Sequence, residues 1–253
     1  GSMRYFPDNP NWLGAFSLST GAGASNHSQF RALRDASNLY LSWVVRASSL
    51  STVVDRVNIL LGDGTNYVAL QVRVASAATT PSPKDQNSGW FTYRLQNCTV
   101  SGSGAITPVA PDLAIDGANL ETTGRMWVDV TTPRRLLQTR WAFQVAIPLG
   151  AAWSPSPLNL PTAGAFKLWF EVWAALPGGT TAHRVPNSTL QTSNILQIIP
   201  PGLNTSHMLD MSTGTAGCDA AVSINWGGIG VRNVAAGDPP RPGTTPAGRC
   251  RAR

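Results

Sequence analysis

Apolar residues fall on every second position in many short stretches of this chain. In 141–150, WAFQVAIPLG, the alternating apolar positions are Trp141, Phe143, Val145, Ile147 and Leu149. A period of two is typical of a β-strand with one buried face. Pro148 fits the end of such a strand, because proline cannot donate a hydrogen bond to a central ladder.

The same alternation predicts further strands and their turns. The glycine-flanked turn Gly62-Asp63-Gly64 predicts that two of these strands form a hairpin, and a turn at 133–135 predicts a second hairpin. Residues 30–36 fit either a strand or a single helical turn, and a short strand is expected near 113–115. The predicted strands are 39–47, 55–64, 66–74, 90–100, 126–132, 141–150, 165–176 and 193–200.

Many short strands, with scarce helical periodicity, predict an all-β protein. We expect an antiparallel β-sandwich, of jelly-roll or immunoglobulin-like appearance, over residues 4–200. Pro200-Pro201 marks the predicted boundary to an irregular, Gly/Pro-rich C-terminal extension, residues 201–253. This extension contains one predicted strand within 220–234 and a linker-like tail from Gly237, which suggests a further domain after the C-terminus.

The composition excludes several classes of function. Charged residues make up 13% of the chain, and the net charge of +6 comes from scattered arginines. Nucleic-acid binding requires clustered basic residues, so we predict no nucleic-acid partner. No apolar run reaches the length of about 20 residues that spans a bilayer, so we predict no membrane span. The lysine-poor, Ala/Arg/Gly-rich usage suggests a bacterial chain.

Three cysteines are too few for a disulfide scaffold. Cys218 and Cys250 flank the Pro/Gly-rich segment and are the candidate disulfide, which would leave Cys98 free. The alternative pairing of Cys98 with Cys218 stays open.

Four segments carry a resemblance to a known family: FRALRDASNLYLSWVVRA, DRVNILLGDG, RWAFQVAIPLG and FKLWFEVW. Over residues 12–200 their order resembles the family 9 carbohydrate-binding modules and the related DOMON-type sandwiches. The chain departs from that family at Gln144 and Val145, where the family carries a glutamate, so no acidic role is transferred there. The matching positions are Asp35, Leu39-Tyr40, Asp55, Val57, Asp63 and Trp141 with Ile147-Pro148-Leu149.

The nine tryptophans are the main candidates for binding a sugar, because indole rings stack on sugar C–H faces. In strand 165–176, Trp169, Glu171 and Trp173 share one face, and the opposite face carries Leu168 and Phe170. If the Leu/Phe face is the core, the trio forms an outward aromatic platform. The alternative is that both faces are covered and the tryptophans are packed. Trp90 and Trp153 are rival platform residues at loop edges, whereas Trp12, Trp43, Trp127 and Trp141 are assigned to packing.

Two further hypotheses concern metal sites. Asp35, Asp55 and Asp63 lie at predicted strand ends, and the family resemblance makes them candidate ligands of a structural calcium ion. The alternative is that they only form turns. In HMLDM, residues 207–211, His207, Met208 and Met211 are the soft ligands that a DOMON-type haem or copper site would use.

No catalytic motif is present, and we predict that the protein is not an enzyme. Asp129 and Glu171 are the only carboxylate pair that we would test for glycoside hydrolysis. The leading hypothesis is a secreted module, extracellular or periplasmic, that binds a polysaccharide or oligosaccharide through exposed tryptophans. The alternatives are a structural or protein-interaction domain of a larger secreted protein, and a DOMON-like domain that binds haem or metal.

Overall fold

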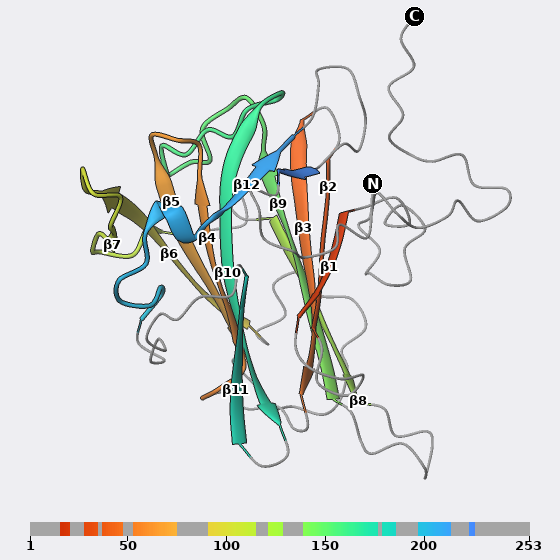
Figure 1. Ribbon diagram of the computed structural model, residues 1–253. Helices are drawn as coiled ribbons and strands as arrows, with labels where there is room; N and C mark the ends of the chain where they lie inside the picture. The colour runs from red at the N-terminus through yellow and green to blue at the C-terminus, as the bar shows by residue number, and fades with distance from the viewer. Residues whose placement is uncertain are drawn as a thin grey trace, which may run out of the picture.

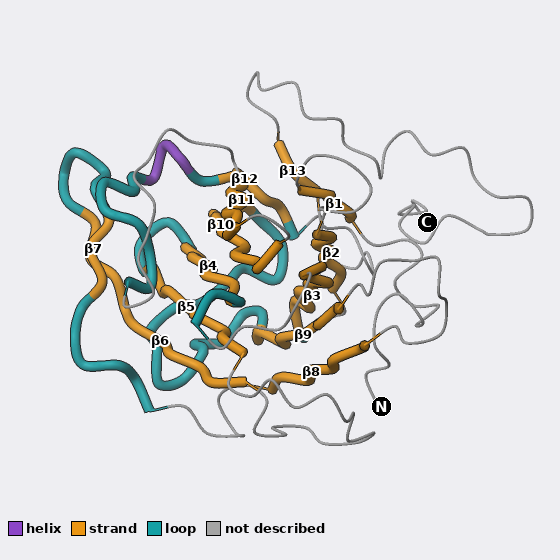
Figure 2. The backbone as a smooth tube through the Cα atoms, turned by 90° about the horizontal axis from the view of Figure 1, so that it is seen from below, coloured by secondary structure: helices purple, strands orange, loops and turns teal. Residues whose placement is uncertain are grey.

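The structure of the protein is a computed structural model. It describes residues 16–20, 28–34, 37–47, 53–74, 91–114, 121–128, 139–176, 179–185, 197–213 and 223–225. Within these residues the regular structure is β-strand, apart from one short 3-10 helix, η2 (Thr205–His207). The strands form two antiparallel sheets that face each other (Figures 1 and 2), which confirms the predicted all-β sandwich. No helix in the described ranges has the length and apolar character that a membrane crossing requires.

The first sheet, called sheet A, contains five strands in the order β1–β2–β3–β9–β8. The central pair, β3 and β9, is aligned from Asn38 opposite Pro148 to Ala47 opposite Thr139. β8 and β9 pair antiparallel, which confirms the hairpin predicted from the turn at 133–135. The bounds are β1 Phe16–Thr20, β2 Ser28–Arg34, β3 Asn38–Ala47, β8 Glu121–Val128 and β9 Thr139–Pro148.

The second sheet, called sheet B, follows the order β13–β12–β10–β4–β5–β6–β7. β11 also pairs with β10, so β11 and β12 share the edge of β10 that β4 does not occupy. The predicted hairpin of 55–64 with 66–74 is confirmed as β4 and β5. The bounds are β4 Arg56–Gly62, β5 Tyr67–Val74, β6 Phe91–Val100, β7 Ile106–Pro108, β10 Ala165–Leu176, β11 Gly179–Val185, β12 Leu209–Ser212 and β13 Ser223–Asn225.

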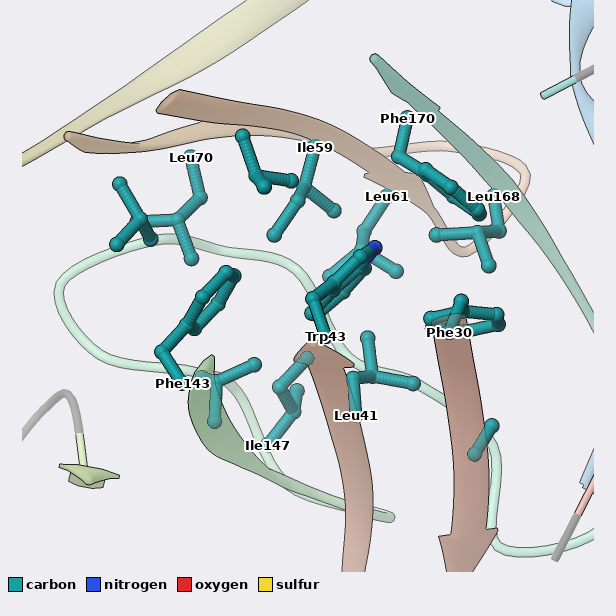
Figure 3. Close-up of a cluster of buried hydrophobic side chains, with 14 of the residues drawn as sticks. Phe30, Leu41, Trp43, Ile59, Leu61, Leu70, Phe143, Ile147, Leu168 and Phe170 are labelled. Atoms are coloured by element: carbon teal, nitrogen blue, oxygen red, sulfur yellow. The ribbon is translucent and has the colours of Figure 1, made fainter. Parts of the chain in front are cut away.

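Aromatic rings from both sheets meet in the space between them (Figure 3). Trp43 of β3 stacks on Phe143 of β9, with ring centroids 4.9 Å apart and an interplanar angle of 10°. Phe170 of β10 lies 4.8 Å from Phe30 and 5.6 Å edge-on from Trp43, measured between ring centroids. All four side chains are at most 1% exposed. The two contacts of Phe170 join sheet B to sheet A.

The alternating apolar residues of 141–150 are buried, as their period of two predicted. Trp141, Phe143, Val145 and Ile147 are each at most 1% exposed and belong to the central core. Burial of such side chains supplies about 1.5–3 kcal/mol each relative to exposure, which is the main force behind this layered arrangement. β9 ends at Pro148, where the ladder no longer needs an N–H donor.

Two expectations about the chain are corrected, and one open alternative is settled. The strand predicted at 193–200 is absent from residues 197–200, and residues 193–196 lie outside the described ranges. Pro200 and Pro201 lack N–H groups, so this part of the chain cannot donate to a ladder. No strand forms at 112–114 either, and residue 115 lies outside the described ranges. β2 settles the choice for 30–36 in favour of a strand through Arg34.

The sandwich does not stop at the predicted boundary. β12, which follows Pro201, pairs with the first residues of β10, from Ala165 opposite Ser212 to Leu168 opposite Leu209. Leu209 and Met211 are buried in the central core. Residues up to 213 are therefore part of sheet B, and β13 is the described portion of the strand predicted within 220–234.

We expect Phe170→Ala to lower the free energy of unfolding by about 3–5 kcal/mol, because it opens a cavity where the two sheets meet. Urea denaturation followed by tryptophan fluorescence measures this loss. Val53→Ala is the control, since Val53 is 64% exposed and should change stability by less than about 0.5 kcal/mol. A small effect of Phe170→Ala would mean that this contact does not hold the sheets together.

Candidate functional site

The outer face of sheet B carries two kinds of surface. Alternation points one set of side chains of β10, β4 and β5 away from the core, and the strand register aligns this set in rows. One row runs from Trp169 through Leu60 to Ala69, and the next from Glu171 through Asn58 to Gln71. The following row consists of Trp173, Arg56 and Arg73. The face therefore changes from apolar to polar within two rows.

The apolar part is covered by the chain before β12. Ile198, Ile199, Leu203 and Met208 pack on Trp169 and its neighbours in a second apolar cluster. We call these four residues the apolar cover. β7 helps to hold the cover in place, because the Ile106 N–H donates to the Leu203 carbonyl over 2.9 Å.

The apolar cover overturns one expectation. Trp169 lies on the outward face of β10, as the alternation predicts, but it is 0% exposed. The prediction that Trp169 forms an exposed platform is wrong, because residues distant in sequence fold over it. The buried Nε1 atom of Trp169 has no hydrogen-bond partner in the part of the chain that the structure describes.

The second row is a chain of buried polar side chains. Asn58 donates from Nδ2 to Glu171 Oε2 over 3.2 Å and accepts at Oδ1 from Gln71 Nε2 over 3.0 Å. Gln71 Nε2 also donates to the Gln197 carbonyl over 3.2 Å. Glu171, Asn58 and Gln71 are at most 1% exposed. Buried polar groups are costly unless they are hydrogen-bonded, so this chain fixes the orientation of each amide.

The third row brings an indole and two guanidinium groups together. The Arg56 guanidinium carbon lies 4.2 Å from the centroid of a Trp173 ring, a cation–π contact. Arg73 is directly opposite Arg56 on the neighbouring strand. Burial lowers the pKa of the Arg56 guanidinium to about 10; Glu171 acts against this shift and Arg73 adds to it. Arg56 is 3% exposed, whereas Trp173 and Arg73 are half-buried and reach the surface.

We call Arg56, Asn58, Gln71, Arg73, Glu171 and Trp173 the polar site. It contains two of the three residues predicted on β10, since Glu171 and Trp173 belong to it and Trp169 does not. Glu171 is inside the molecule and does not stand on an open platform, because the amide of Asn58 and the neighbouring row enclose it. Sequence reasoning missed the four contributions from β4 and β5. The hairpin turn could have revealed them, because it sets Asn58 opposite Gln71 and Arg56 opposite Arg73.

The other predicted tryptophans do not join this site. Trp153 is 2% exposed and belongs to the central core, so the prediction that it forms an exposed loop-edge platform is wrong. Its backbone pairs with Leu158 within a tight loop, which turns the indole inward. Trp43 and Trp141 are buried, as the packing assignment predicts. Trp90 and Trp12 lie outside the described residues, as does the side chain of Trp127.

The candidate calcium ligands are not brought together. Asp55 and Asp63 lie at opposite ends of β4, about 26 Å apart along an extended strand. Asp55 accepts the Ala175 N–H at Oδ1 over 2.8 Å, which ties β4 to β10. Asp35 lies outside the described residues, and no metal-binding group of three or more His, Cys, Asp or Glu residues occurs among those described.

Asp63 organises the β4–β5 turn. Its Oδ1 accepts the N–H groups of Thr65 and Asn66 over 2.8 and 2.7 Å, and its Oδ2 accepts the Asn159 N–H over 2.9 Å. Burial alone would raise the pKa of the Asp63 carboxyl, but these backbone hydrogen bonds outweigh burial and lower it. This carboxylate is therefore fully used by the turn and by the loop around Asn159.

The proposed soft-metal cluster does not form. Met208 packs in the apolar cover, whereas Met211 is buried in the central core on the other face of sheet B. His207 accepts the Asn204 N–H at Nδ1 over 3.1 Å and closes the capping box of η2. The three side chains thus serve three different structural tasks, and the DOMON-type haem hypothesis loses its ligand set.

Two further expectations concern the cysteines and the carboxylate pair. Cys98 is a free thiol, which argues against its alternative pairing with Cys218, and burial raises the pKa of this thiol to about 12. Cys218 and Cys250 lie outside the described residues. Asp129 also lies outside them, so its position relative to Glu171 stays a prediction; β8, which ends at Val128, is in sheet A, whereas β10 is in sheet B.

The Asp63 turn makes stability depend on pH. We expect Asp63→Ala to lower the free energy of unfolding by about 1 kcal/mol at pH 7. Because the folded-state pKa of Asp63 is lowered, the stabilisation is present above the unfolded value of about 3.9 and is lost as the pH falls through the folded value. Urea unfolding at pH 7 and at about pH 3 should show the wild type and variant converging. A difference that is the same at both pH values would contradict this account.

The buried amide chain also predicts a pH-dependent variant. In Asn58→Asp, a carboxylate replaces the amide that donates to Glu171, and unfolding free energy at pH 7 should fall by about 2–4 kcal/mol. The two neighbouring carboxylates repel each other when both are charged, so the loss should be smallest in acid and grow as the pH rises above about 4. Adding Glu171→Gln restores a donor between the two positions and should recover most of the stability. Failure of this rescue would show that the two side chains are not coupled.

Comparisons with known proteins give distant similarities. No family model matches the sequence, and no curated protein matches it. The chain is similar to a family 9 carbohydrate-binding module (CBM9) from Caldicellulosiruptor kristjanssonii in complex with cellotriose, with 14% identity, a TM-score of 0.43, and coverage of 86% of this chain and 91% of that chain. The same source's module in complex with glucose has 14% identity, a TM-score of 0.39 and coverage of 83% and 90%.

A further similar structure is a proposed carbohydrate-binding protein from Bacteroides uniformis ATCC 8492. It has 13% identity and a TM-score of 0.48, and the alignment covers 79% of this chain and 86% of that chain. All three TM-scores are below 0.5, so neither family membership nor function transfers from these structures to this chain.

Proposed function

We propose that this protein is a non-catalytic carbohydrate-binding module and that the polar site is its binding face. The observation that carries the proposal is the half-buried Trp173 ring beside Arg56 and Arg73, backed by the hydrogen-bonded Glu171–Asn58–Gln71 chain. Sugar sites combine an aromatic surface for C–H faces with a few oriented polar groups for hydroxyls. The polar site supplies both on one rigid sheet.

Each component has a defined task in this proposal. Trp173 is the stacking surface. Arg56 covers a face of its ring, but the side chain is only half-buried and still reaches the exterior. Arg73 offers hydrogen-bond donors at the surface. Asn58 and Gln71 hold the strands in register behind them and limit rotation of Glu171. A preformed site of this kind loses little entropy when a ligand binds.

The absence of catalysis is part of the proposal. Glycoside hydrolysis requires two carboxyl groups that face the same sugar bond, about 5–10 Å apart. The described carboxylates on this side of sheet B are each held by a protein donor. Glu171 accepts from Asn58, Asp112 lies 2.8 Å from Arg94, and Asp210 lies 2.6 Å from Lys167. We also propose that the protein works outside the cytoplasm, where polysaccharides are the available ligands.

A second candidate is an accessory or interaction domain without a small ligand. It is favoured by the burial of Trp43, Trp141, Trp153 and Trp169, each at most 2% exposed. These indoles build the sandwich and offer no surface for stacking. Acrylamide quenching of tryptophan fluorescence, compared between the wild type and Trp173→Phe, separates the two candidates. An accessible Trp173 predicts weaker quenching in the variant, whereas a shielded Trp173 predicts no decrease.

We expect Trp173→Ala to weaken saccharide binding by about tenfold or more, because losing an aromatic anchor costs about 1–2 kcal/mol. Affinity gel electrophoresis with a panel of soluble neutral and acidic polysaccharides measures the change. Tyr93→Ala is the matched control, because it removes a half-buried ring from the inner side of the same sheet. Equal retardation of wild type and Trp173→Ala would overturn the assignment of the site, and no retardation by any polysaccharide would overturn the function.

A further inference from the structure

Two arginines face each other on the outer side of sheet B. The register sets Arg56 of β4 directly opposite Arg73 of β5. Side chains in such cross-strand positions have Cβ atoms about 4.5–5.5 Å apart, and like charges there are destabilising. A folded protein tolerates this arrangement when something else offsets the repulsion.

The surrounding residues offset only part of the charge. Arg56 donates to the Val54 carbonyl over 3.2 Å, lies on Trp173 and is attracted by Glu171. The Arg73 side chain has no hydrogen bond or ion pair in the part of the chain that the structure describes. The polar site thus holds two guanidinium groups and one carboxylate. Nearby Arg94 and Lys167 are already paired with Asp112 and Asp210.

A third donor lies in the same row. Trp173 Nε1 is buried and has no hydrogen-bond partner within the described ranges. An indole N–H and a guanidinium group can only donate hydrogen bonds. The row of Trp173, Arg56 and Arg73 is therefore rich in donors and positive charge, and the group that completes it must accept hydrogen bonds and carry negative charge.

We propose that the polar site binds an acidic saccharide, whose ring carries a carboxylate or sulfate group that Arg73 receives beside Trp173. This inference rests on the proposed carbohydrate-binding function and names its ligand class. A guanidinium group matches a planar carboxylate with two parallel hydrogen bonds, which makes the contact both strong and directional. Binding the anion also offsets the repulsion between Arg56 and Arg73. The sugar ring that carries the anionic group then lies against the Trp173 indole.

The test uses pairs of ligands that differ only in charge. Polygalacturonate is compared with its methyl-esterified form, and dextran sulfate with dextran, by titration calorimetry at low and moderate salt. We expect at least tenfold tighter binding of one charged ligand than of its neutral partner, with the preference falling as salt rises. The first pair reports on carboxylates and the second on sulfates, so either preference identifies the anion.

Variants separate the site from general attraction by a basic protein. Arg73→Gln should reduce binding of the charged ligand to the level of its neutral partner, and Arg73→Lys should retain only part of the preference. Arg94→Gln is the matched control, because it removes one positive charge from the same side of the sheet but from an existing ion pair. It should leave affinity within about twofold of the wild type, since surface charges contribute weakly at a distance.

Thermal unfolding provides a second readout. Arg73→Gln should leave the melting temperature unchanged or raise it, because it removes a repulsive partner of Arg56. Equal binding of charged and neutral ligands, or equal effects of Arg73→Gln and Arg94→Gln, would overturn the acidic-ligand inference and leave carbohydrate binding intact. Failure of every saccharide to bind would overturn the proposed function itself.

Discussion

The contact of Phe170 with Phe30 and Trp43 is the point where the two sheets meet, and the polar site depends on it. Side chains alternate along β10, so a strand that turns Phe170 into the core must turn Glu171 outward. The ladder then aligns Glu171 with Asn58 and Gln71, and Trp173 with Arg56 and Arg73. The geometry of the outer face is thus set by packing on the inner face.

Local pattern was enough to predict the parts of the molecule that are close in sequence. Alternation located β9 and β10, and the Gly62-Asp63-Gly64 turn paired β4 with β5. The same turn also fixes which residues of the hairpin face each other, so the opposed arginines could have been derived from the sequence. Trp173 and Glu171 were singled out because a period of two sets them on one face.

The fate of Trp169 could not be predicted in the same way. Nothing in β10 distinguishes it from Trp173, since both are indoles on the same face of one strand. They differ because the apolar cover comes from residues 198–208, which have no alternation and lie some distance along the chain. Sequence pattern identifies the face to which a side chain belongs, whereas its exposure depends on segments that arrive from elsewhere. Trp153 is buried for a different reason, because its own loop, closed by the backbone hydrogen bond to Leu158, turns the indole toward the central core.

The shared edge of β10 has a consequence for how much chain the fold requires. β12 pairs with the first residues of β10 and β11 with the last, so neither half of that edge is open. A polypeptide cut after the double proline at 200–201 would lose Leu209 and Met211 from the central core and would expose a row of unpaired N–H and C=O groups at Ala165–Leu168. Such a row is a template for another strand, so the shortened molecule would tend to self-associate edge to edge.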